Sequence, residues 1–150
     1  MDWPGEIRMA RDADGSAIGT LYAEAGQPDH GVDWQRDGLG GWWMVGERDG
    51  NILGALQVIA SKPFGYIGEI VVHPSERGRS DNGHGTLGVW GGVLGRLLYF
   101  TAQIMLEKAG VQIVLGTVRE DLMPTFGVIL TKKYGGTDLG RFHLLGKRIT

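Results

Sequence analysis

The sequence contains no cysteine and carries little excess charge of either sign. Without cysteine, this chain of 150 residues can form neither disulfides nor thiolate metal sites. Fifteen lysines and arginines against seventeen aspartates and glutamates leave a formal net charge of −2. That balance argues against a general nucleic-acid or anionic-membrane binder. The four histidines show no metal-ligand spacing, so we expect no metal site.

A signal-peptide pattern is also lacking. Residues 1–15 include several acidic side chains and no apolar core, which does not indicate secretion, and we expect a cytoplasmic protein. Hydrophobic residues make up 42% of the chain and charged residues 21%, a composition typical of globular proteins. No internal repeat and no low-complexity linker is present, so we expect a single domain over residues 1–150.

Alternating and helical hydrophobic patterns predict an α/β fold. Its order is strand, helix, a polar glycine-rich connection, three strands, long helix, strand, short helix and final strand. The ranges are 6–10, 17–26, 27–41, 42–48, 52–60, 66–72, 85–109, 111–118, 123–133 and 139–149. Asp12 and Asp14 offer N-cap oxygens to the first helix, and Asp49-Gly50 predicts a tight hairpin. Pro63-Phe64-Gly65 predicts a second turn, and the apolar run 111–118 a strand covered on both faces.

Glycine is unusually abundant. It makes up 27 of the 150 residues, whereas its ordinary share of a protein is roughly 7%. Within residues 86–106, two Gly-x-x-x-Gly spacings resemble a membrane-helix dimer face. Arg96 falls in the middle of that segment, where a charge in lipid costs a few kcal/mol. The flanking strands also require the segment as their crossover. We therefore expect a helix that lies close on the sheet and no membrane span.

Residues 69–86, with the sequence EIVVHPSERGRSDNGHGT, carry the strongest functional signal. A strand ends at His73-Pro74, a loop rich in glycine and arginine follows, and a helix begins near Gly85. Unpaired N–H groups and the dipole of a helix N-terminus favour phosphate, and arginines add positive charge. The pattern indicates a ligand that bears phosphate, although a plain flexible loop is the alternative. Neither the dinucleotide fingerprint nor a nucleotide-triphosphate loop is present.

This segment resembles the GNAT superfamily of N-acetyltransferases. The superfamily signature is a strand ending in V-x-P, followed by x-x-[RQ]-G-x-G-x-G at the start of a long helix. Here Val72-His73-Pro74-Ser75-Glu76-Arg77-Gly78-Arg79 is followed by Gly83-His84-Gly85-Thr86-Leu87. Residues 80–82 interrupt the motif and lengthen the loop. The order of the predicted elements matches the superfamily over most of the chain, which implies a mixed, largely antiparallel twisted sheet flanked by helices.

The resemblance implies acetyl-CoA as co-substrate and direct transfer of the acetyl group to a primary amine of an unidentified small molecule, peptide or protein. Pantetheine would lie along the strand at Ile70, Val71 and Val72. The pyrophosphate would be held by the loop and the start of the helix, at Arg77, Gly78, Arg79, Gly83, His84, Gly85 and Thr86.

Two residues are candidates for acid–base chemistry. Glu69 would accept the proton of the attacking amine through a water molecule, and strand alternation places it on one face with Ile67 and Val71. A solvent-facing glutamate is the alternative. Tyr134 is the candidate acid for the departing thiolate, although the position usual in the superfamily holds Thr131. A packing or surface role for Tyr134 is the alternative.

A second function stays open at this point. The absent tyrosine and the lengthened loop are compatible with a non-catalytic GNAT-like binding or structural subunit, for example a phage particle component. Among the tryptophans, Trp42 and Trp43 alternate across their strand, and at least one of them is expected in the core. The sequence does not define the acceptor, and a homodimer or larger assembly is compatible with it.

Overall fold

The computed structural model of the chain describes residues 3–26, 41–77, 92–116, 132 and 135–140. The chain divides into two compact units, residues 1–117 and residues 118–150. In the second unit Lys132 is helical, Gly135 has a positive φ of 70°, and residues 135–140 form no helix or strand. The rest of the predicted short helix and of the final strand lies outside the described residues. The elements below belong to the first unit.

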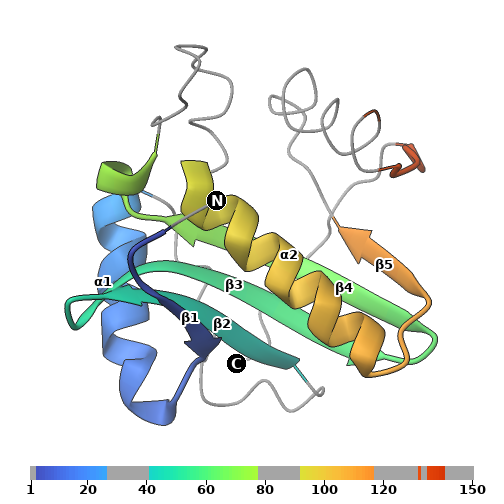
Figure 1. Cartoon of the computed structure of the whole chain (residues 1–150), viewed down its shortest axis with the longest axis horizontal. Helices are drawn as coiled ribbons and strands as arrows, with labels where there is room; N and C mark the ends of the chain where they lie inside the picture. The colour runs from blue at the N-terminus through green and yellow to red at the C-terminus, as the bar shows by residue number, and fades with distance from the viewer. Residues whose placement is uncertain (1–2, 27–40, 78–91, 117–131, 133–134, 141–150) are drawn as a thin grey trace, which may run out of the picture. The chain divides into compact units, whose positions relative to one another are not determined.

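The first unit is built on a sheet of five strands, whose spatial order follows the sequence (Figure 1). The first four pair antiparallel, and the fifth runs parallel to the fourth. The strands are β1 (Glu6–Met9), β2 (Gly41–Arg48), β3 (Asn51–Ser61), β4 (Phe64–Val72) and β5 (Ile113–Gly116). The predicted mixed, largely antiparallel sheet is therefore confirmed.

The two hairpin turns of the sheet differ in how well the sequence located them. Asp49 and Gly50 have φ values of 53° and 78°, which are the left-handed pair that a two-residue type I′ turn requires. The second turn is shorter than predicted, because Ser61 pairs with Phe64. Phe64 and Gly65 thus belong to β4, since two residues are enough to reverse an antiparallel pair.

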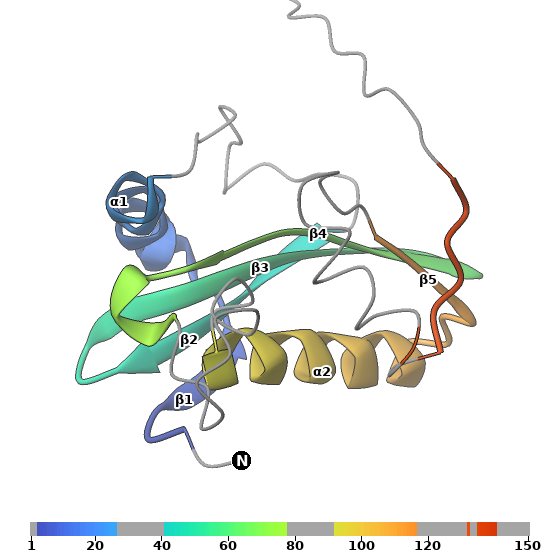
Figure 2. The same ribbon diagram turned by 90° about the horizontal axis from the view of Figure 1, so that it is seen from above.

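One helix covers each face of the sheet, so the unit has three layers (Figure 2). Helix α1 (Gly15–Ala25) ends at Gly26 with φ 67°, and α2 (Gly92–Lys108) is followed by Gly110 with φ 84°. Both glycines end their helices as predicted. The buried residues between α1 and the sheet, contributed by both, are Ile18, Leu21, Tyr22, Trp43, Val45, Ala55 and Val71. Against α2 they are Met44, Leu56, Val58, Ile67, Val72, Leu94, Leu98, Ala102, Leu106 and Val111.

Three glycines of the sheet bring α2 close to the strands. A Cβ added at Gly46 would come within 2.5 Å of a Leu94 methyl group. At Gly54 it would meet Leu94 and Leu98 at 2.9 Å, and at Gly65 it would meet Leu106 at 2.9 Å. The expected close packing of the long helix is therefore seen, and here it depends on glycines of the strands.

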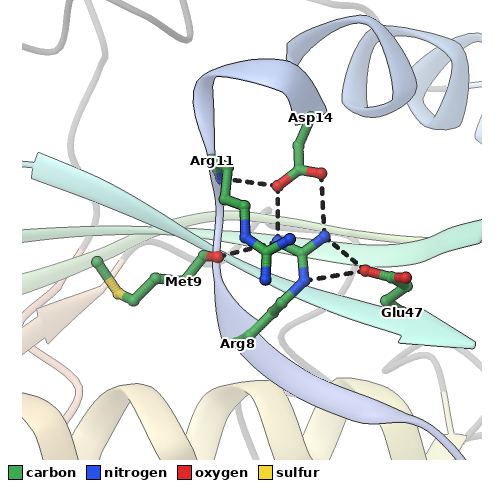
Figure 3. A network of polar contacts seen from close by, with 5 residues as sticks. All are labelled: Arg8, Met9, Arg11, Asp14 and Glu47. Atoms are coloured by element: carbon green, nitrogen blue, oxygen red, sulfur yellow. Dashed lines mark hydrogen bonds and ion pairs between the residues drawn. The ribbon is translucent and has the colours of Figure 1, made fainter. Parts of the chain in front are cut away.

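A polar network fixes β1 to the start of α1 and to β2 (Figure 3). Arg8 donates from Nε and Nη2 to Glu47, at 2.9 and 2.5 Å, and from Nη1 and Nη2 to Asp14, at 2.7 and 3.0 Å. Its remaining Nη1 hydrogen goes to the Met9 carbonyl at 3.0 Å, so all five donors are used. The hydrogen bonds from Arg8 lower the pKa of Asp14 to about 2.

The capping prediction for α1 is wrong in its chemistry. Asp14 does stand at the helix start, but its carboxylate caps no helix N–H. The carboxylate accepts the backbone N–H of Arg11 at 2.7 Å and binds the guanidinium of Arg8. A charged donor with two parallel N–H groups holds a carboxylate more strongly than a neutral helix N–H does.

Strand β5 is less covered than its sequence predicts. Ile113 remains 47% exposed, and only Val114 and Leu115 are half-buried. Among the described residues, coverage of both faces is therefore wrong for this strand, since Ile113 and Gly116 are exposed. No helix within the described part of the chain is long and apolar enough to cross a membrane.

Candidate functional site

The candidate site is centred on the second half of β4, where pairing with β5 ends. The parallel pairing joins Phe64 through Ile67 of β4 to Ile113 through Gly116 of β5. From Gly68 onward, no residue among those described pairs with β4 on that side. On its other side, β4 stays paired with β3 up to Val72. Among the described residues, β4 is therefore paired with β5 only from Phe64 to Ile67.

A β-bulge interrupts β4 where that pairing ends. Leu56 of β3 pairs with Ile70, whereas Val58 pairs with Ile67, so Gly68 and Glu69 together face the single residue Gln57. A Cβ at Gly68 would lie 2.7 Å from the amide oxygen of Gln57. Glycine at this position therefore lets the Gln57 side chain lie against the strand.

The bulge overturns the predicted faces of β4. Simple alternation put Ile67, Glu69 and Val71 on one face, but Ile67 packs in the core against α2 and Val71 in the core against α1. The extra residue reverses the alternation upstream of the bulge. Of Glu69 itself, the structure describes the backbone in β4 and not the side chain, so its catalytic role stays a prediction.

The three residues predicted to line pantetheine, Ile70, Val71 and Val72, differ in the direction of their backbone N–H and C=O groups. The His73 N–H donates to the Leu53 carbonyl at 2.8 Å, so His73 and, two residues earlier, Val71 direct their backbone groups toward β3. Ile70 and Val72 direct theirs to the opposite edge. The Val71 side chain is fully buried under α1. The edge is therefore formed by the backbone of Ile70 and Val72.

The turn that follows β4 is capped by a histidine. Short helix η2 (Pro74–Glu76) begins after His73, whose Nδ1 accepts the Ser75 backbone N–H at 3.1 Å. Nδ1 also lies 2.7 Å from the Ser75 hydroxyl oxygen. On the other side of the ring, Nε2 lies 3.2 Å from a carboxylate oxygen of Glu24 in α1.

Arg77, the first residue of the predicted phosphate loop, contacts protein carbonyls. Its Nε donates to the Val72 carbonyl at 2.8 Å, and its Nη2 donates to the Ala25 carbonyl at 3.3 Å. These contacts place the side chain between the end of β4 and the last turn of α1, and its predicted contact with a pyrophosphate stays a prediction.

The opposite side of η2 is held by Glu76. One carboxylate oxygen pairs with Arg48 at the end of β2, and the other accepts the Trp3 indole N–H at 3.1 Å. The Arg48 guanidinium also lies 5.9 Å from the centre of the Trp3 ring, within cation–π range. No local pattern in the sequence indicates this cluster, because its members are separated by up to 73 positions.

The remaining predicted site residues lie outside the described residues. These are Gly78, Arg79, Gly83, His84, Gly85, Thr86 and Tyr134. The predicted long helix is described from Gly92 onward. Gln57 and the bulge were missed by the sequence analysis, although a glycine inside a strand pattern, here Gly68, is the signal that could have indicated the bulge.

Comparison with known proteins establishes the architecture. No family model and no curated protein matches the chain. Among solved structures, an acetyltransferase of Trypanosoma brucei superposes with a TM-score of 0.67 at 19% identity, covering 95% of this chain and 99% of that one. A ribosomal-protein-alanine N-acetyltransferase from Brucella melitensis gives 0.66 at 14% identity, with coverage of 95% and 99%.

An aminoglycoside N-acetyltransferase in complex with CoA gives a TM-score of 0.66 at 16% identity, covering 97% of this chain and 95% of that chain. Identities of this size compare folds and not individual residues. With the mixed sheet, the bulged fourth strand and one helix on each face, they show that the chain has the fold of the GNAT acetyltransferases.

Proposed function

We propose that the chain is a cytoplasmic N-acetyltransferase that transfers an acetyl group from acetyl-CoA to a primary amine. The observation that carries the proposal is the β-bulge in β4, a strand that leads directly into a segment whose sequence resembles the phosphate loop of the GNAT superfamily. Structures with the same fold include an aminoglycoside N-acetyltransferase in complex with CoA. Their likeness supports a CoA thioester beside β4.

The backbone of β4 suits a ligand that carries amide groups. Pantetheine has two amides, and the edge formed by Ile70 and Val72 directs N–H and C=O groups away from β3. The Val72 carbonyl already accepts from Arg77, so the Val72 N–H is the backbone group that we propose to hold pantetheine, which would lie along Ile70, Val71 and Val72. The pyrophosphate would bind the N–H groups of the loop at Gly78, Arg79, Gly83, His84, Gly85 and Thr86.

The proposed reaction needs one base and one acid. The neutral amine nitrogen attacks the thioester carbonyl, the carbon–sulfur bond breaks, and the sulfur leaves as a thiolate. Glu69, at the bulge, would take the amine proton through a water molecule. Tyr134 is the proposed donor to the thiolate, and water can replace it because a thiolate is a weak base. The transfer is direct and forms no covalent intermediate with the protein.

Acetyl-CoA binding is the first test. A ligand that binds only the folded protein stabilises it by mass action and so raises the midpoint of thermal unfolding. At a ligand concentration of a hundred times Kd, the free energy of unfolding increases by about 2.7 kcal/mol. We expect acetyl-CoA and CoA to raise the midpoint, and S-acetyl-N-acetylcysteamine, which lacks the phosphates, not to do so at equal concentration. An unchanged midpoint at saturating acetyl-CoA would contradict the proposal.

Turnover is the second test. Release of free thiol from acetyl-CoA, followed with a panel of peptide, amino-sugar and polyamine acceptors, measures transfer directly. Glu69→Gln should lower kcat, most strongly at low pH where the amine is protonated, and leave acetyl-CoA affinity unchanged. Glu6→Gln, at an exposed position of β1, is the matched control. Acetyl-CoA binding without turnover on any acceptor would favour the non-catalytic subunit.

A further inference from the structure

The turn between β4 and the predicted phosphate loop is tied to the protein on two sides. Helix η2 lies beside α1 in both views (Figures 1 and 2). His73 and Arg77 bind the last turn of α1 on one side, and Glu76 binds Arg48 and Trp3 on the other. The segment that precedes the predicted phosphate loop is thus held by side chains on both sides.

Arg77 forms the tie that is nearest to the loop. Both of its contacts are with carbonyls that accept no backbone hydrogen bond within their own sheet pair or helix. Val72 directs its carbonyl away from β3, and Ala25 is the last residue of α1. A guanidinium at a helix C-terminus also complements the negative end of the helix dipole. Both interactions favour the side chain staying where it is.

The shape of the guanidinium matters for this tie. Nε and Nη2 lie on one edge of a planar group, so a single arginine reaches two carbonyls from different elements. A lysine ammonium in the same place keeps the positive charge, but its single nitrogen cannot reach both carbonyls as the planar guanidinium does. Lysine would therefore preserve a phosphate contact better than it would preserve this bridge.

We infer that Arg77 is a positioning residue of the phosphate loop and not a phosphate ligand. The inference rests on the proposed binding of acetyl-CoA. By joining β4 to α1, Arg77 sets where the loop begins, and the loop N–H groups together with Arg79 meet the phosphates. Of the two loop arginines, only Arg79 then contributes its charge to the ligand.

The test compares conservative and neutral substitutions at both arginines. Arg77→Lys and Arg77→Gln should weaken acetyl-CoA binding alike, by about tenfold, the equivalent of one lost charge-assisted hydrogen bond. Both should also lower the unfolding midpoint without ligand and leave the salt dependence of Kd unchanged. Arg79→Gln should weaken binding more than Arg79→Lys, flatten the salt dependence and leave the ligand-free midpoint unchanged.

Other results would overturn the inference. Full affinity in Arg77→Lys with weak, salt-insensitive binding in Arg77→Gln would make Arg77 a phosphate ligand. Unchanged affinity in both variants, with lower midpoints, would leave it a purely structural residue. A wild-type protein that does not bind acetyl-CoA would refute the proposed function and this inference together, whereas the results above refute the inference alone.

A measurement on the wild-type protein covers the case in which the Arg77 variants do not fold. The Nε–H of Arg77 donates to Val72 before any ligand is present, so its NMR resonance should be protected from exchange in the free protein. Added CoA should leave that resonance nearly in place and shift that of Arg79. A large shift or a newly gained protection at Arg77 on CoA addition would contradict the inference.

Discussion

Replacing Asp14 by asparagine tests the energetics of the Arg8 network. The aspartate titrates near pH 2 in the folded protein against an ordinary value of 3.8, because Arg8 donates two hydrogen bonds to it. At 1.36 kcal/mol per pKa unit, this shift corresponds to about 2 kcal/mol of stability. The side chains of Arg8 and Asp14 are only 11% and 13% exposed, so solvent screening removes little of it.

The sign of the pH dependence follows from the lowered pKa. A carboxylate whose pKa is depressed by folding stabilises the protein above its unfolded value, and that contribution is lost as the pH falls through the folded value. We therefore expect Asp14→Asn to be about 2 kcal/mol less stable than wild type at pH 7. The difference should shrink as the pH falls from about 4 toward 2, where the wild-type carboxyl group becomes neutral too.

Urea unfolding followed by tryptophan fluorescence measures this difference at several pH values between 7 and 3. Asp12→Asn is the matched control, because Asp12 lies in the same turn and is exposed. The reasoning fails if Asp14→Asn unfolds at the same urea concentration as the control at pH 7. It also fails if the stability difference stays constant as the pH falls.

The packing of the two helices gives three further predictions. Gly54→Ala should destabilise the protein by about 1–3 kcal/mol, because its Cβ would meet Leu94 and Leu98 at 2.9 Å. Gly19→Ala in α1 has no neighbour within 4 Å of the new Cβ and should stabilise by about 0.5–1 kcal/mol. Leu98→Ala should cost about 2–5 kcal/mol, since Leu98 is fully buried. Urea unfolding at pH 7 checks all three, and equal effects of the two glycine substitutions would contradict the packing argument.

Local signals in the sequence located the elements whose ends depend on a single residue. Asp49-Gly50 and the glycines at 26 and 110 adopt the positive φ values that their turns and caps require. The bulge in β4 could not be located in this way, because it depends on which residue of β3 faces Gly68 and Glu69. Periodicity assumes an uninterrupted strand, so it assigned Ile67 to the wrong face.

Side-chain partners were harder to predict than elements. Asp14 stands where a helix cap is expected, yet Arg8 comes from a neighbouring strand and takes its carboxylate. Arg77 carries the residue type that the phosphate motif requires, yet Val72 and Ala25 receive its donors. In both cases the partner comes from a neighbouring element of the fold, and a motif contains no information about such neighbours.

The positions of the sheet glycines have a consequence for the orientation of α2. Gly46 and Gly54 lie beneath Leu94, near the N-terminal end of the described helix, whereas Gly65 lies beneath Leu106, near its C-terminal end. A methyl group at the first pair would raise one end of the helix axis, and a methyl group at Gly65 would raise the other. The inclination of α2 relative to the sheet thus depends on these three glycines of the strands. Substitutions there would change the direction of the described helix without altering a residue of the predicted phosphate loop.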